Sequence, residues 1–296
     1  MKPAEQIHPA LRRYSGHRTR PDRWADWQPN VGDIIICTPA KCGTTWTQAI
    51  VTMLLYGTVD LPARVSALSP WVDSNLSDAD NVNNVPLGAS GRRVIKTHTP
   101  TDGFPVWKGV SVVAFYRHPL DVLLSVRKHL MNMKDVDGGE ICAPLDAALS
   151  FYLNGVFDVQ SNDTDKLATI ATHYTHTLHR PDQEDLVLLH YADMIADHHG
   201  TVVHLARSLG IDADDALIDA ITKATAIDAM RSDPVKFAPE GGKGFWHNDA
   251  GFFAKGGINQ WREAFDDLQV AGFDDRLAVL VPDPQERAWI KFGAAA

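Results

Sequence analysis

Short apolar runs alternate with longer stretches of helical spacing along this chain. The runs at 34–37, 93–96, 110–116 and 186–190 predict buried strands. Helical spacing follows in the ranges 46–56, 120–131, 143–158, 164–179, 193–209 and 213–231, with two short helices expected around 261–268 and 274–281. Strands that alternate with helices predict an α/β fold, in which a parallel sheet carries helices on both faces.

The turn after the first strand carries the residue types of an anion site. Backbone N–H groups and the helix dipole favour an anion where a strand leads through a glycine-containing turn into a helix. Thr44 and Thr45 add hydroxyl donors, and Lys41 adds a positive charge. The order differs from a Walker A motif, because Lys41 precedes Gly43. This stretch predicts a phosphate or sulfate ester site, and the alternative is an ordinary turn with a surface lysine.

Two further predicted strands also end in polar residues. Lys96 and His98 follow the second strand, and Arg117 follows the third. Ligands of open parallel sheets bind at the carboxyl ends of the strands, so these side chains and Lys41 are expected to converge. The long irregular segments 58–91 and 234–260 are expected to act as binding loops or lids beside them.

Composition narrows the class of protein. The 296 residues are 45% hydrophobic and 22% charged, which suits one domain over 1–296, with a polar extension over 1–30 packed on the body through Trp24 and Trp27. The net charge of -9 argues against a general nucleic-acid binder. Three cysteines without framework spacing favour a reduced, cytoplasmic setting. Neither a signal peptide nor a membrane-spanning run is expected.

Five segments together resemble the sulfotransferase family that uses 3'-phosphoadenylyl sulfate (PAPS). They are Pro-Ala-Lys-Cys-Gly-Thr-Thr-Trp at 39–46, Lys-Thr-His-Thr-Pro at 96–100, Arg-His-Pro-Leu-Asp-Val-Leu-Leu-Ser at 117–125, Leu-His-Tyr-Ala-Asp-Met at 189–194 and Phe-Phe-Ala-Lys-Gly-Gly-Ile-Asn-Gln-Trp at 252–261. Their order matches the family over about residues 25 to 270. The resemblance implies a P-loop NTPase-like three-layer fold, with a central parallel sheet of about five strands.

The resemblance also implies roles for individual residues. The catalytic residues would be His98, Lys41, Lys96 and Ser125, and Ser125 would also hold Lys41 in its resting position. The residues that bind PAPS, or its product adenosine 3',5'-bisphosphate (PAP), would be Lys41, Cys42, Gly43, Thr44, Thr45, Trp46, Arg117, Ser125, Tyr191, Thr225, Ile227, Lys255 and Gly256. Trp46 would stack on the adenine.

The chemistry of sulfuryl transfer suits these residue types independently. A histidine such as His98 is largely neutral at pH 7 and can take the proton of an attacking hydroxyl or amine. Lys41, and secondarily Lys96, can stabilise the charge that develops on the leaving phosphate. The transferred group carries one negative charge, so the need for Mg²⁺ is smaller than in phosphoryl transfer, and no metal is expected.

The sequence departs from the family pattern at several positions. Cys42 replaces the usual serine, and Ala254 replaces an arginine that would bind the 3'-phosphate, for which Lys243 is a possible substitute cation. Asn-Gln at 259–260 replaces a Gly-Asp pair. The dimer motif of animal cytosolic members is absent from 262–271, which leaves the oligomeric state open.

Two other functions fit parts of the pattern, namely an ATP-dependent small-molecule kinase and a non-catalytic PAP sensor. The acceptor is expected to be a phenol, alcohol, sterol or lipid hydroxyl, with apolar walls drawn from Trp71, Phe104, Phe151, Tyr152, Phe245 and Trp246. His173, His176 and His179 are expected to form a solvated helix face rather than a metal patch.

Overall fold

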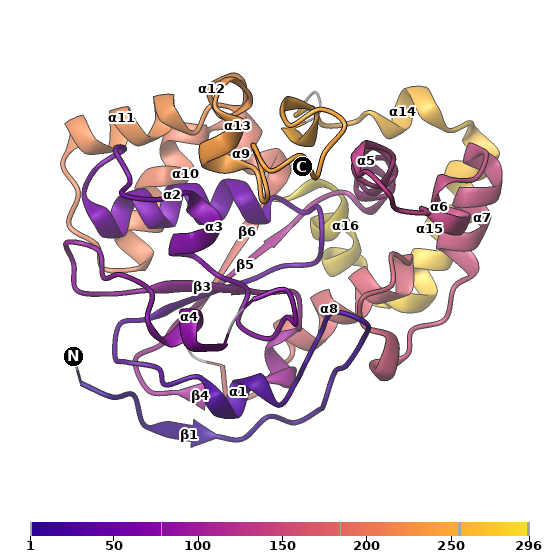
Figure 1. The fold of residues 1–296 in the computed structure, drawn as a ribbon. Helices are drawn as coiled ribbons and strands as arrows, with labels where there is room; N and C mark the ends of the chain where they lie inside the picture. The colour runs from indigo at the N-terminus through magenta and orange to yellow at the C-terminus, as the bar shows by residue number, and fades with distance from the viewer. Residues whose placement is uncertain (1, 78, 184, 254–255, 295–296) are drawn as a thin grey trace.

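A four-stranded parallel sheet forms the centre of the fold (Figure 1). We analysed a computed structural model that describes residues 2–77, 79–183, 185–253 and 256–294. The strands, in spatial order, are β3 (Val94–Thr97), β2 (Ile34–Cys37), β5 (Ser111–Tyr116) and β6 (Leu186–His190). About five strands were expected. The two remaining strands of the described residues, β1 (Gln6–His8) and β4 (Val106–Trp107), instead pair antiparallel with each other.

Helices cover both faces of the sheet (Figure 1). Ile34 and Ile36 of β2 belong to the same core as α2 (Thr44–Tyr56), α10 (His198–Ser208) and α11 (Asp215–Ala224). On the other face, Ala114 and Tyr116 of β5 pack with α5 (Pro119–Asn132), α7 (Leu145–Asn154), α8 (Leu167–Leu178), α15 (Asp267–Leu280) and α16 (Pro284–Phe292). Strands buried on both faces give the continuous apolar runs that the sequence shows.

Several predicted helices are shorter or divided in the structure. The expected helix over 193–209 is two, α9 (Tyr191–Ala196) and α10, because Asp197 caps α10 by accepting from the Gly200 N–H. The expected helix over 213–231 divides into α11 and α12 at residues 225–226. The remaining helices are α1 (Arg23–Asp26), α3 (Val65–Leu68), α4 (Ala79–Asn83), α6 (Gly139–Cys142), α12 (Ile227–Ser232), α13 (Pro234–Phe237) and α14 (Trp261–Ala264), with 3-10 turns η1 (Thr101–Gly103), η2 (Val159–Ser161) and η3 (Ala250–Phe253).

The N-terminal extension packs on the face of the sheet formed by β3, β2 and β5. Trp24 and Trp27 are buried in a cluster with Ile35 and Ile95. The Trp24 ring stacks on Phe104 with 4.5 Å between ring centroids. Phe104 is 1% exposed in this cluster, which corrects its expected place in an acceptor wall.

Asp73 ties the extension to the end of β3. Its buried carboxylate accepts hydrogen bonds from the indole N–H of Trp24 (3.2 Å) and of Trp71 (2.8 Å). It also accepts from the hydroxyls of Thr97 (2.9 Å to each oxygen) and Thr99 (2.6 Å). Burial raises the pKa of Asp73, and the two threonine hydroxyls oppose that rise. The loop at 71–75 and the strand end that carries Lys96 are thereby joined at one carboxylate.

We expect Asp73→Asn to lower the free energy of unfolding by about 2–4 kcal/mol, because the amide NH₂ would face donors that are left unsatisfied in the interior. Urea denaturation of the purified variant measures this loss. Asp212→Asn is the matched control, because Asp212 is exposed. A stability change at Asp73 no larger than that of the control would contradict the structural role.

Candidate active site

The turn between β2 and α2 is shaped by two residues with positive φ. Lys41 has φ 63° and Gly43 has φ 112°. A Cβ atom at position 43 would lie 2.3 Å from the Phe115 ring of β5, so only glycine allows this close approach. The hydroxyls of Thr38 and Thr44 are hydrogen-bonded at 2.6 Å across the turn. The turn leads into the 13-residue helix α2, whose N-terminus faces the end of the sheet.

A cavity of about 930 Å³ lies beside this turn. Its walls include the turn itself, the ends of β3 and β5, and one side of α5. The predicted site residues that line it are Lys41, Gly43, Thr44, Thr45, Trp46, Trp71, Lys96, His98, Arg117, Ser125, Tyr152, Tyr191, Ile227, Phe245, Trp246 and Gly256. Three strand ends therefore do converge on one cavity.

Of the remaining predicted residues, those that the structure describes do not line the cavity. The Cys42 side chain is fully buried in the core with Tyr116, and burial raises the pKa of its thiol to about 12. Thr225 is also fully buried, where its hydroxyl donates to the Ile221 carbonyl (2.7 Å). Phe151 packs on the core beside α8 and does not line the cavity. Ala254 and Lys255 lie outside the described residues.

Lys41 points toward α5. Its ammonium lies 3.1 Å from Nδ1 of His129 and 4.3 Å from the centroid of the Phe252 ring. The expected resting partner was Ser125, which lies one helical turn earlier and lines the same cavity. Burial, together with the nearby charges of Arg117 and Lys96, lowers the pKa of Lys41 to about 7, and the charge of Asp165 opposes this shift. The cation thus has no carboxylate against it among the contacts that the structure describes.

His98 is held in one tautomer. Its Nδ1–H donates to the Thr38 carbonyl at 2.6 Å, so Nε2 carries the lone pair. That Nε2 lies 3.3 Å from the Lys96 ammonium, and the ring meets Trp71 edge-on with 4.6 Å between centroids. Burial, and secondarily the Lys96 charge, hold the pKa of His98 well below its usual value. His98 is therefore a neutral base whose free nitrogen faces a lysine.

Lys96 is the cation next to this base. Its ammonium lies 4.5 Å from the centroid of the Trp71 ring. Burial lowers the pKa of Lys96 to about 8, against the opposing effect of Asp73.

Arg117 is a further cation that lines the cavity. Its guanidinium lies over the Tyr191 ring at 4.4 Å and donates to the Gly257 carbonyl at 2.8 Å. Tyr191 in turn contacts Trp46 edge-on, with 5.4 Å between centroids. Arg117 is 6% exposed, and its Nε–H has no partner among the described residues. A buried donor of this kind is suited to bind an anion.

Asp121 of α5 holds the backbone segment at 257–261. Its carboxylate accepts from the backbone N–H groups of Asn259 (2.9 Å) and Trp261 (3.1 Å). Gly257, whose carbonyl binds Arg117, belongs to the same segment. The expected substitute cation, Lys243, lines the cavity but is paired with Glu240 at 2.9 Å.

The cavity residues that the sequence interpretation missed include Arg18, His129 and Asp165. His129 could have been found, because it is four residues after Ser125 on a predicted helix and so shares its face. Arg18 lies in the polar extension, and Asp165 precedes α8, which begins at Leu167 instead of 164. Neither of these two carried a local signal.

The expected solvated face of His173, His176 and His179 holds for His179, which is exposed, but not for His173. His173 is 2% exposed and is hydrogen-bonded to the Tyr116 hydroxyl at 2.9 Å, which overturns that expectation for His173. Within the described ranges no group of three or more His, Cys, Asp or Glu side chains is arranged to hold a metal. No helix in the described part of the chain is long and apolar enough to cross a membrane.

A parallel α/β sheet with an anion-binding turn, three cations and a neutral histidine at one edge defines a group-transfer enzyme for an anionic group. The chain belongs to the sulfotransferase domain family, whose sequence model matches residues 31–282. This match confirms the predicted family and enzyme class.

Relatives and solved structures agree with that assignment. A glycolipid sulfotransferase of Mycobacterium tuberculosis is 31% identical over 92% of this chain and 91% of that protein. Mouse sulfotransferase 1B1 is 24% identical over 86% of this chain and 84% of its own length. A retinol dehydratase crystallised with androsterone and PAP has a TM-score of 0.69 at 16% identity, covering 88% of this chain and 84% of that one. A mouse sulfotransferase complexed with PAP has a TM-score of 0.66 at 20% identity, over 88% and 89%. These two structures confirm the predicted fold class.

We expect the affinity for PAP to fall about tenfold between pH 7 and 8.5. Lys41 has a pKa of about 7 in the empty site, so the ammonium is charged below that pH and neutral above it. Binding a phosphate favours the charged form, so binding at pH 8.5 requires proton uptake. Calorimetric titration in buffers of different ionisation enthalpy measures both quantities. In Lys41→Met the proton uptake should be smaller, and a wild-type affinity that does not change with pH would refute the linkage.

We expect Asp121→Asn to weaken PAP binding about 10- to 100-fold, with melting of the apo protein changed far less. The amide leaves the N–H groups of Asn259 and Trp261 poorly bonded, and this releases the segment that positions Arg117. Calorimetry with PAP measures the loss. Asp274→Asn, at an exposed ion pair with Lys291, is the control, and an unchanged affinity in Asp121→Asn would show that the segment is not needed.

Proposed function

We propose that this sulfotransferase transfers a sulfuryl group from PAPS to a hydroxyl of a small, largely apolar acceptor. One observation carries the proposal: the free Nε2 of His98 and the ammonium groups of Lys41 and Lys96 share a single cavity. A base for the attacking hydroxyl and cations for the leaving phosphate are thus available together. The PAP found in the two solved relatives supports PAPS as the donor.

The donor would use the side of the cavity formed by α2 and Arg117. The N-terminus of α2, with Thr44 and Thr45, would bind the phosphosulfate. Arg117 and Ser125, two residues of the same cavity wall, would bind the 3'-phosphate, which Lys255 and Gly256 would approach from the other segment. The adenine would lie against Trp46. These assignments follow the motif resemblance, and the exposure of these groups to one cavity supports them.

The reaction would be an in-line displacement. The acceptor hydroxyl would give its proton to Nε2 of His98 as its oxygen attacks the sulfur atom. The bond from sulfur to the bridging oxygen would break, and that electron pair would remain on the phosphate of PAP. Lys41 and Lys96 would stabilise this charge, and the low pKa of each lysine leaves a proton that can be shared with the leaving oxygen.

The apolar walls favour a lipid or sterol type of hydroxyl. Val126 and Met133 of the α5 region, together with Phe245 and Trp246, line one part of the cavity. The mycobacterial relative's name, glycolipid sulfotransferase, supports a lipid part in the acceptor. We further propose a cytoplasmic setting, since Cys37, Cys42 and Cys142 are free thiols.

The two rival functions fit less of the site. A kinase would not need a second anion site at Arg117 and Ser125 at the spacing of a 3'-phosphate. A PAP sensor would not need a neutral base beside a lysine. The PAPS reaction would use both features, the anion site at Arg117 and Ser125 and the base His98 beside Lys96.

The deciding experiment compares donors and a base variant. Transfer of ³⁵S from PAPS to a panel of phenols, alcohols and sterols should proceed equally with EDTA, and ATP should not act as a donor. His98→Gln should lower the turnover about 10²- to 10⁴-fold. Its affinity for PAP should change little, because His98 lies on the acceptor side of the proposed site.

Two outcomes would reject the proposal. Stabilisation by Mg·ATP without any by PAP would favour the kinase. PAP binding in the wild type, with no turnover on any acceptor and no effect of His98→Gln, would favour the sensor. Thermal shift separates these cases, because a ligand stabilises by RT ln(1 + [L]/Kd).

A further inference from the structure

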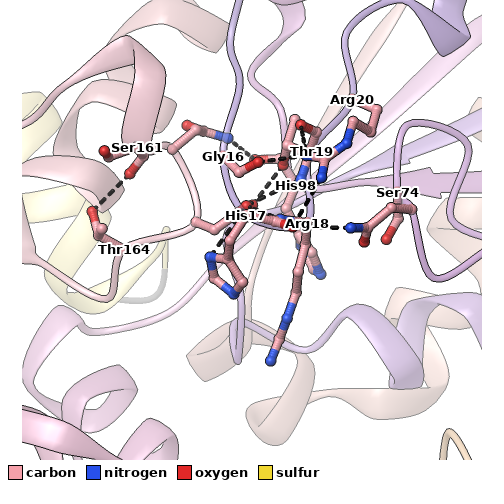
Figure 2. Close-up of polar contacts among 12 residues, drawn as sticks. Gly16, His17, Arg18, Thr19, Arg20, Ser74, His98, Ser161 and Thr164 are labelled. Carbon is pink, nitrogen blue, oxygen red and sulfur yellow. Dashed lines mark hydrogen bonds and ion pairs between the residues drawn. The ribbon is translucent and has the colours of Figure 1, made fainter.

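Two charged side chains line the cavity without a role in donor binding or in the proposed proton transfer. Arg18 comes from the N-terminal extension, and Asp165 precedes α8. These residues are far apart in the sequence, and no motif includes either of them. The Arg18 N–H nevertheless donates to the carboxylate of Asp163, two residues before Asp165. Figure 2 shows the extension around Arg18 beside the segment that carries Ser161 and Thr164.

A set of hydrogen bonds fixes the backbone of Arg18. The Asp163 carboxylate accepts from the N–H groups of Arg18 (2.6 Å) and Thr19 (3.0 Å) and from the Thr19 hydroxyl (2.5 Å). The Ser15 N–H donates to the Val159 carbonyl at 2.8 Å. Figure 2 shows the Arg18 side chain extending away from these bonds, while Arg20 donates back to the carbonyls of its own segment. The extension therefore delivers one fixed guanidinium to the cavity.

Neither side chain is satisfied by the protein. Over the residues that the structure describes, the guanidinium of Arg18 and the carboxylate of Asp165 have no hydrogen-bond or ion-pair partner. Burial raises the pKa of Asp165 to about 6, and the charge of Arg18 opposes that rise. His98, the proposed base, lines the same cavity as this guanidinium. Free donors and free acceptors thus face the place where the acceptor would react.

The opposite charges of Arg18 and Asp165 favour an acceptor group that is neutral and carries several hydroxyls. A sugar hydroxyl donates to a carboxylate and accepts from a guanidinium, so a ring with several hydroxyls can satisfy both. A polyanionic acceptor would be repelled by Asp165, and a purely apolar one would leave both charged groups desolvated and unpaired. Serine hydroxyls at 66, 69 and 77 line the same cavity and add further hydrogen-bonding groups.

We propose that Arg18 and Asp165 form a head-group subsite, which binds hydroxyls of the acceptor other than the one that is sulfated. The acceptor is then a sugar head group on an apolar tail, and the tail lies along the apolar wall near Phe245 and Trp246. This inference rests on the proposed sulfuryl transfer. It adds that a polar subsite of the cavity selects the acceptor by its hydroxyls, because an acceptor without them leaves the two charged groups unpaired.

The test uses n-octyl β-D-glucoside and 1-octanol, which share an alkyl chain and differ by the sugar. In the wild-type enzyme, kcat/KM with ³⁵S-labelled PAPS should be at least 100-fold higher for the glucoside. Arg18→Ala and Asp165→Asn should each lower that ratio tenfold or more, mainly through KM. Arg13→Ala is the matched control, because Arg13 lies on the same extension but pairs with Asp22 at the surface.

A binding measurement makes the inference independent of turnover. With PAP present, calorimetric titration should give a Kd for the glucoside that Arg18→Ala and Asp165→Asn raise tenfold or more. The affinity for PAP should be the same in all four proteins. Glucoside binding that neither variant weakens would overturn the subsite.

Other outcomes are equally decisive. Equal losses on both acceptors, with a lower melting temperature, would make Arg18 and Asp165 structural. Tighter binding of octyl sulfate than of the glucoside, weakened by Arg18→Ala alone, would mean an anion site. Either result overturns the subsite while sulfuryl transfer stands. Failure of PAP to bind the wild type would instead reject the proposed function itself.

Discussion

The structure depends on one electrostatic constraint: three cations meet at one edge of the sheet, and no carboxylate of the described residues is paired with any of them. Lys41, Lys96 and Arg117 each lie over an aromatic ring instead, at 4.3, 4.5 and 4.4 Å from Phe252, Trp71 and Tyr191. A cation–π contact stabilises a charge by about 0.5–2 kcal/mol and does not neutralise it. The cations are therefore positioned while their charge stays available to an anionic substrate.

The carboxylates near this edge are used for architecture. Asp73 accepts from two indoles and two threonines, Asp121 from two backbone N–H groups, and Asp163 from the backbone of the N-terminal extension. Each of them joins segments that are distant in the sequence. An acidic protein with a net charge of -9 can thus present a basic cavity, because Asp73, Asp121 and Asp163 are bonded to neutral donors and not to the cations.

The sequence predicted the features that are local in the chain. A strand, a glycine turn and a helix start are contiguous at 34–46, and polar strand ends converge wherever the strands are parallel, so Lys41, His98 and Arg117 could be expected at one cavity. Features that depend on tertiary packing were missed. Arg18 reaches the cavity only because Asp163 binds its backbone, and His173 is buried only because Tyr116 lies opposite it. The sequence around Phe104 does not distinguish a ring that packs on Trp24 from a ring that lines a pocket.

The position of Lys41 follows from the neutrality of His129. Burial and the charge of Lys41 hold the pKa of His129 well below its usual value, so Nδ1 can accept a hydrogen bond from the ammonium. A hydrogen bond between a charged and a neutral group contributes about 1.5–3 kcal/mol, far less than a buried ion pair costs to break. A carboxylate at position 129 would compete with an incoming phosphate for Lys41. A neutral imidazole holds the lysine in one position in the empty site, and it does not compete with an anion for the charge of the lysine.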